Sequence, residues 1–127
     1  MTAYISHTSI DCTNAFELAT WWKQALGYED LPGDALAPGE PECMIVSRTG
    51  HQLLFIEVPE RKQTKNRIHF DLRPSQRSRE AEVEHLISLG ASQVADFRNA
   101  DGTGWVVLQD PEGNEFCVLR SEAELSE

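Results

Sequence analysis

The sequence has few cysteines, few basic residues and no long apolar run. Cys12, Cys43 and Cys117 show none of the paired spacing of a disulfide framework or a CxxC zinc site, so we expect free thiols. Only 11 basic residues stand against 21 acidic ones, and the formal net charge of −10 disfavours nucleic acid and anionic membranes as partners. No stretch approaches the roughly 20 apolar residues of a membrane helix. The first residues show no basic segment before an apolar one, so we expect a cytoplasmic protein.

The length of 127 residues and the hydrophobic fraction of 40% suit one compact domain. Within it, residues 67–72 alternate between an apolar and an ionisable set. The apolar set is Ile68, Phe70 and Leu72, and the ionisable set is Arg67, His69 and Asp71. Such alternation predicts a half-buried strand whose apolar face packs against a helix or core. Its ionisable face then lines either solvent or a cleft.

The remaining pattern predicts a helix and further strands on each side of this segment. The first helix begins after Asn14, which with Glu17 has the spacing of a capping box, and it ends at Leu26-Gly27. A second helix follows residues 74–76 and ends at Leu89-Gly90. The other expected strands are residues 4–11, a short segment after Tyr28, and residues 42–48, 52–58, 92–97, 105–109 and 114–119.

These elements predict an internal duplication. His7 and His69 are 62 residues apart, the two Leu-Gly helix ends are 63 apart, and each half has the order strand, helix and three strands. One half leaves a sheet face and the sheet edges uncovered. We therefore expect an α+β fold in which two βαβββ modules form a curved mixed sheet around a cleft, with the helices on its outer face. The expected divisions are module one at about 1–58, a connector at 59–65, module two at 66–120 and an acidic tail at 121–127 that need not be ordered.

The duplication and two local stretches resemble the vicinal oxygen chelate superfamily of glyoxalases, bleomycin-resistance proteins and extradiol dioxygenases. The stretches are residues 16–28 in the first helix and residues 110–116, Asp-Pro-Glu-Gly-Asn-Glu-Phe, before the last strand. Residues 53–60, 65–72 and 113–117 resemble the small actinobacterial-type glyoxalase-like domains within it. The resemblance covers nearly the whole chain and implies the fold more specifically than the activity, because this scaffold hosts several chemistries.

The resemblance also implies a metal site. Metal-dependent members use a histidine of the first strand, a glutamate or similar residue of the fourth, a histidine of the fifth and a glutamate of the eighth. His7 and His69 match the two histidines, and Glu57 is the third candidate. The family's last glutamate stands seven residues after the Asp of the Asp-Pro-Glu-Gly turn, where this chain has Cys117. Glu115, two residues earlier on the same strand face, is an alternative.

These residues are compatible with two kinds of site. Two imidazoles and a carboxylate suit one divalent transition metal, Zn, Ni, Mn or Fe, and a cysteine ligand favours zinc. In the alternative site, Asp71 orients or protonates His69, which gives a ligand-binding cluster without a metal. Cys117 is then a small buried hydrophobic residue.

Each kind of site predicts a different function. A metal site predicts an isomerase or lyase that acts on a carbonyl-bearing substrate, with Glu57 or Glu115 as the proton-moving base. A metal-free cleft predicts a binding or drug-sequestering protein of the bleomycin-resistance type, whose ligand contacts are Trp22, Phe55, Trp105 and Arg67. A third reading is a vestigial cleft. The partners expected are a small molecule and a second copy of the chain, as a homodimer.

Overall fold

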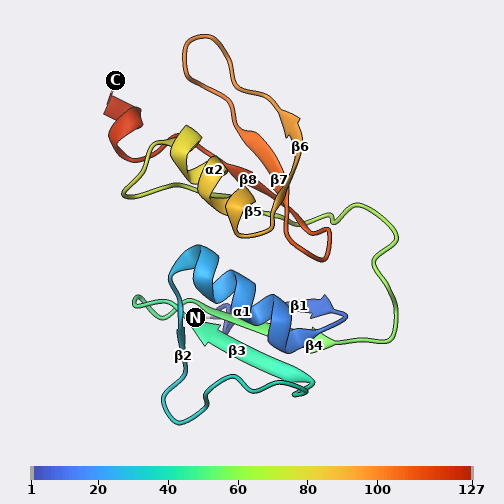
Figure 1. Ribbon diagram of the computed structural model, residues 1–127. Helices are drawn as coiled ribbons and strands as arrows, with labels where there is room; N and C mark the ends of the chain where they lie inside the picture. Colours follow the sequence, from blue (N-terminus) through green and yellow to red (C-terminus); the bar gives the residue numbers. More distant parts are fainter. Residues whose placement is uncertain (1, 127) are drawn as a thin grey trace. The chain divides into compact units, whose positions relative to one another are not determined.

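The computed structural model describes residues 2–126, which form two compact units that divide between Lys62 and Gln63. Each unit contains one α-helix and one four-stranded sheet (Figure 1). The division falls inside the connector expected at residues 59–65. Within residues 2–126, no helix has both the length and the apolar character needed to cross a bilayer.

The first unit has the order strand, helix and three strands. Its elements are β1 (Thr8–Cys12), α1 (Ala15–Leu26), β2 (Glu29–Asp30), β3 (Glu42–Val46) and β4 (Gln52–Glu57). The sheet order is β1-β4-β3-β2, in which β1 runs parallel to β4 and the other pairs are antiparallel. The parallel pair follows from the helix between β1 and the later strands, because a crossover returns the chain in the same direction.

Helix α1 begins and ends where the sequence predicts. The Asn14 side chain accepts a hydrogen bond from the backbone N–H of Glu17 at 3.0 Å, as an N-cap residue does. Gly27 follows the last turn with φ 69°, a left-handed conformation that glycine adopts without strain. The helix packs on β3 and β4. Its Leu18 and Trp22 side chains are buried on the sheet face that carries the fully buried Phe55.

The second unit repeats this topology. Its elements are β5 (Phe70–Leu72), α2 (Arg79–Ser88), β6 (Ser92–Asp96), β7 (Val106–Gln109), β8 (Glu115–Val118) and a 3₁₀-helix, η1 (Ala123–Ser126). The sheet order is β5-β8-β7-β6, with β5 parallel to β8. The expected α+β class and the duplicated modules are therefore confirmed. The arrangement of both sheets around one shared cleft stays a prediction.

The second unit differs from the sequence-based expectation in three places. Strand β5 is three residues shorter at its start, because residues 67–68 form a bend and Ile68 is 81% exposed instead of packed against a helix or core. Helix α2 begins only after Ser78, whose side chain accepts from the backbone N–H of Ala81. Residues 123–126 of the acidic tail form η1, where Glu124 accepts backbone hydrogen bonds from Arg79 and Ser121. Glu127 lies outside the described residues.

The two faces of the second sheet carry different side chains. Val106, Leu108, Phe116 and Val118 are fully buried, on the face that α2 covers. The alternate positions on β7 and β8 point to the opposite face, because successive side chains of a strand project to opposite sides. These positions are Val107, Glu115 and Cys117, and together with Trp105 just before β7 and Leu119 just after β8 they line a cavity.

Candidate functional site

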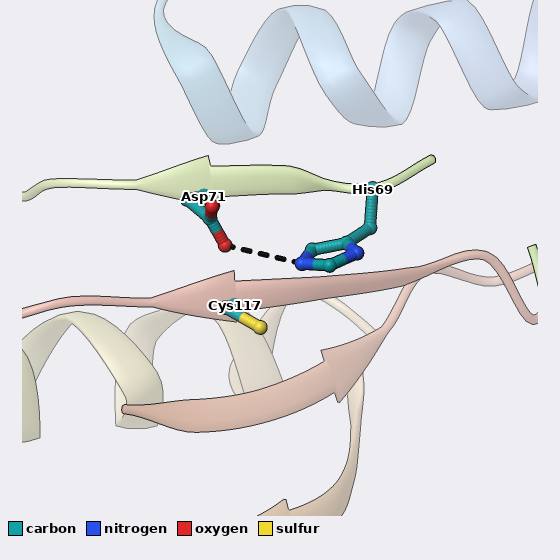
Figure 2. Close-up of side chains that lie close together, drawn as sticks. All are labelled: His69, Asp71 and Cys117. Atoms are coloured by element: carbon teal, nitrogen blue, oxygen red, sulfur yellow. Dashed lines mark ion pairs between the residues drawn. The ribbon is translucent and has the colours of Figure 1, made fainter. Parts of the chain in front are cut away.

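A histidine, an aspartate and a cysteine meet on the open face of the second sheet. His69 directly precedes β5, Asp71 lies within β5, and Cys117 is the residue paired with Asp71 on β8. Figure 2 shows the His69 ring and the Asp71 carboxylate on the same side of their strand, next to the Cys117 sulfur. His69 Nε2 is 3.4 Å from Asp71 Oδ1, and one ligand atom from each of the three residues lies within 4.8 Å of the others.

The Cys117 thiol is protonated at neutral pH. Burial, followed by the negative charge of Asp71 and a hydrogen bond from the thiol to that carboxylate, raises the pKa of Cys117 from 9.0 to about 11. Lys65 acts in the opposite direction and Glu115 in the same one as Asp71. The thiolate needed for nucleophilic attack or metal ligation therefore forms only when something displaces this proton, as a bound metal ion does.

This protonation predicts slow alkylation. At pH 8 we expect iodoacetamide to modify Cys117 roughly 100-fold more slowly than a thiol of pKa 9.0, since the thiolate is the nucleophile. Asp71→Asn should accelerate the reaction, because it removes the negative charge that holds the proton. Mass spectrometry of the Cys117 peptide measures the rate. Glu122→Gln is the control, because it removes the charge of an exposed carboxylate outside the cluster. Equal rates in Asp71→Asn and the unchanged protein would show that Asp71 does not control this thiol.

The cluster forms the polar part of a cavity of about 350 Å³. Its apolar part is Phe97, Trp105, Val107 and Leu119, and Lys65 and Glu115 complete the lining. The Phe97 and Trp105 rings have centroids 5.6 Å apart and lie 53% and 43% exposed, which is unusual for such large apolar side chains. A pocket with a few polar groups beside an aromatic wall is the usual form of a small-molecule site.

Glu115 is held by an ion pair at one side of this cavity. The Lys65 ammonium donates to Glu115 Oε2, and the side chains are 67% and 18% exposed, respectively. Lys65 comes from the segment before β5, and Glu115 is the first residue of β8. Glu115 and Cys117 share a face, as predicted, so a carboxylate that could move a proton lies on the same strand face as the cluster.

The site residues predicted from the sequence fall into both units. His69, Asp71, Cys117, Glu115 and Trp105 all line the cavity of the second unit. Arg67 lies in the bend before β5, and Lys65 is the basic residue of the lining. The four-ligand set of His7, His69, Glu57 and Cys117 has members in both units and stays a prediction.

The predicted site residues of the first unit differ in exposure and in hydrogen-bond partners. Glu57 is exposed at the end of β4 and accepts a hydrogen bond from the backbone N–H of Ala15 at the start of α1, at 3.2 Å. His7 is half-buried, and its Nδ1 lies 3.0 Å from the Ser6 hydroxyl. Trp22 and Phe55 are at most 1% exposed and pack in the core, which leaves their predicted ligand contacts without support.

Sequence reasoning missed part of the site. Asp71 was expected to orient His69 or contact a ligand, but its carboxylate is also placed as a metal donor. Phe97, Val107 and Leu119 were not singled out. Val107 and Leu119 each lie two residues after a predicted site residue, Trp105 and Cys117, so strand alternation could have predicted that they face the same side. Lys65 lies in a polar connector whose sequence carries no such signal.

The comparisons with known proteins decide the family. The model of the glyoxalase-like domain matches residues 7–119. The chain belongs to this family. The match confirms the resemblance to the vicinal oxygen chelate superfamily. A comparison with curated proteins finds no match to this glyoxalase-like protein.

Solved structures with low sequence identity share the fold. FosX from Listeria monocytogenes, a fosfomycin resistance protein determined with Mn(II) and sulfate, is 13% identical with a TM-score of 0.71, over 98% of this chain and 94% of its own. Protein ATC0852 from Agrobacterium tumefaciens is 14% identical with a TM-score of 0.72, over 94% and 98%. A glyoxalase/bleomycin resistance protein/dioxygenase family enzyme from Burkholderia phytofirmans is 18% identical with a TM-score of 0.63, over 89% and 94%.

The donor set of the cluster fits a transition-metal ion. The three donors are an imidazole nitrogen, a carboxylate oxygen and a sulfur, a combination found in zinc sites. Tetrahedral zinc places neighbouring N and O ligands roughly 3.4 Å apart, given bond lengths of about 2.0–2.2 Å. The observed 3.4 Å between His69 Nε2 and Asp71 Oδ1 agrees with this spacing, and the three ligand atoms, which lie within 4.8 Å of one another, would draw closer together around an ion. Three protein ligands would leave one position for a substrate or water, as in catalytic zinc sites.

Proposed function

We propose that the cavity of the second unit binds a small aromatic molecule that carries a carbonyl group, together with one divalent transition metal at the polar end. The observation that carries this proposal is the joint presence, in one cavity, of the His69–Asp71–Cys117 cluster and the Phe97–Trp105 wall. The wall offers two accessible aromatic rings, which favour a planar apolar group. The cluster offers the ligand atoms for the metal and hydrogen-bonding groups for the carbonyl end.

The residues of the cavity have distinct proposed roles. His69, Asp71 and Cys117 would hold the ion, and the sulfur donor favours zinc over manganese, nickel or iron. When bound, the ion supplies Lewis-acid polarisation of a carbonyl oxygen. Glu115 is the proton-moving base, positioned by its ion pair with Lys65. The aromatic wall orients the substrate and excludes water from one side. These roles suit an isomerase or a lyase.

Loss of the aromatic wall is expected to abolish much of the binding. We expect Trp105→Ala to weaken binding of 2-acetylnaphthalene, a neutral aromatic ketone, by about 10-fold or more, because one large contact surface is lost. Isothermal titration with zinc-loaded protein measures the affinity. Tyr4→Ala is the control, since Tyr4 is an aromatic residue 84% exposed in the first unit. No binding by the unchanged protein, or equal affinity in the Trp105 variant, would contradict the proposed ligand site.

A second candidate function is metal-free sequestration of a small molecule. It is favoured by the thiol of Cys117, which already donates to the Asp71 carboxylate, so the cluster satisfies its own polar groups without an ion. Deuterium incorporation next to the carbonyl of 2-acetylnaphthalene, in its methyl group, distinguishes the candidates by NMR. Zinc-dependent incorporation that is lost in Glu115→Gln supports proton-transfer chemistry, and binding without incorporation supports sequestration.

We propose further that the glyoxalase-like protein is a cytoplasmic homodimer. Support for a dimer comes from the position of β1 and β5 as outermost strands of their own sheets, since outermost strands are where a sheet can extend by pairing with a second chain. Sedimentation equilibrium measures the oligomeric state, and a monomer at all accessible concentrations would contradict the dimer.

A further inference from the structure

The aromatic wall of the cavity belongs to the hairpin between β6 and β7. Phe97 and Trp105 stand at the two sides of its loop, where the N–H of Phe97 donates to the carbonyl of Trp105 at 2.8 Å. The loop projects beyond the sheet (Figure 1). Both rings are about half exposed, so packing in the core does not fix them. The loop's own hydrogen bonds, such as that from the N–H of Asn99 to the carbonyl of Thr103 at 2.8 Å, join its two sides to each other, so a contact with another element is what can fix it relative to the sheet.

Arg79, in the first turn of α2, binds this loop directly. Its Nη1 donates to the carbonyl of Gly104 at 3.0 Å, and its Nη2 donates to the carbonyl of Gly102 at 3.1 Å. The carbonyl of Gly104 belongs to the peptide bond that leads into Trp105. The guanidinium therefore fixes the peptide that immediately precedes one of the two wall residues.

Burial makes this interaction strong. Arg79 is only 7% exposed, and a buried cation is costly unless its donors are satisfied. The planar guanidinium meets two carbonyls with two separate donors, which fixes direction as well as distance. The backbone N–H of Arg79 also donates to Glu124 of η1, so the residue is held from a second side.

At Gly104 the backbone of the loop lies close to the backbone of Phe97 on the other side of the hairpin. Gly104 has φ 93°, and a Cβ added to it would lie 2.0 Å from the carbonyl oxygen of Phe97. Only glycine allows the two sides of the hairpin to approach in this way. The position of the Gly104 carbonyl and that of Phe97 are therefore coupled, and a group that holds one also holds the other.

We infer that Arg79 is a positioning residue for the small-molecule site: through the carbonyls of Gly102 and Gly104 it fixes the Phe97–Trp105 wall. The inference rests on the proposed function in so far as the wall binds a ligand. It assigns to α2, which covers the opposite face of the sheet, a part in the specificity of the cavity. It also predicts that affinity for an aromatic ligand depends on a residue outside the cavity lining.

Acrylamide quenching of tryptophan fluorescence tests the inference without a ligand. Trp105 is 43% exposed, whereas Trp21 and Trp22 are 7% and 1% exposed, so quenching reports mainly Trp105. We expect Arg79→Met to raise the quenching constant about twofold, because the released loop opens more often. Trp105→Phe removes the accessible fluorophore and confirms the assignment. Arg77→Met is the matched control, since Arg77 pairs with Glu82 on the surface.

Ligand binding provides the second readout. We expect Arg79→Met to weaken binding of 2-acetylnaphthalene about 10-fold while zinc affinity stays unchanged, since neither Arg79 nor the glycines it binds belong to the cluster or to the cavity lining. Arg79→Lys keeps the charge and can donate to one carbonyl, so its quenching constant and its affinity for the ketone should be intermediate. This variant replaces Arg79→Met in both measurements if Arg79→Met does not fold. Quenching in both variants equal to that of Arg77→Met would overturn the inference. Failure of the unchanged protein to bind the ketone would overturn the proposed function, and the quenching result would still decide the role of Arg79.

Discussion

Phe116→Ala is expected to lower the free energy of unfolding of the second unit by about 3–5 kcal/mol. Phe116 is fully buried at the centre of its sheet, on β8 between β5 and β7. Its removal leaves a cavity between the sheet and α2 that surrounding side chains fill only in part. The loss is a large share of the 5–15 kcal/mol by which a domain is usually stable. Urea denaturation followed by circular dichroism measures it.

Phe97→Ala is the matched control for this change. The same side chain is removed, but Phe97 is 53% exposed and lies on the open face of the sheet. We expect a loss of about 1 kcal/mol or less, as for most exposed positions. Similar losses at the two positions would mean that the division into a core face and an open face is incorrect.

The fold could be predicted because its signals are local and occur twice. The Asn14 cap and the Leu26-Gly27 end determine α1 by themselves, and the second half repeats the order of elements. Strand β5 was predicted too long because alternation continues through residues 67–68, where the chain bends. Alternation reports which side chains would share a face in an extended chain, but it does not report whether a neighbouring strand is present to pair with.

The site could be predicted only in part, because residue type does not distinguish core from cavity. Trp22 belongs to the apolar stripe of α1, which packs between helix and sheet. Phe55 lies on the same buried side, and Trp105 lies on the open side of its own sheet. A consistent use of strand alternation would have separated Phe55 from the open face. The contact between His69, Asp71 and Cys117 required the register of β5 on β8, which the sequence does not give.

Loss of a cluster side chain is expected to remove most of the metal affinity. We expect one zinc ion per chain to bind the unchanged protein and to raise its free energy of unfolding by about 2.7 kcal/mol at a zinc concentration 100 times the Kd. His69→Ala, Asp71→Ala and Cys117→Ala each remove one of three protein ligands. Each should lower the affinity for zinc at least about 100-fold. Substitution of a residue that only hydrogen-bonds to a metal ligand already lowers metal affinity roughly 10- to 100-fold, and loss of a ligand itself costs more. Thermal shift with added zinc, and metal analysis of protein purified without chelator, measure the effect.

The controls for this prediction separate ligation from general loss of stability. Cys43→Ala removes a cysteine that is 2% exposed and lies in the first unit, and His85→Ala removes a histidine on α2. Both variants should keep the zinc shift even if they unfold at a lower temperature. His7→Ala decides whether the ligand set extends to the first unit. If this variant no longer binds zinc, His7 is a ligand together with the cluster. Retention of zinc in all three cluster variants would contradict a metal site on this face and would leave metal-free binding as the function of the cavity.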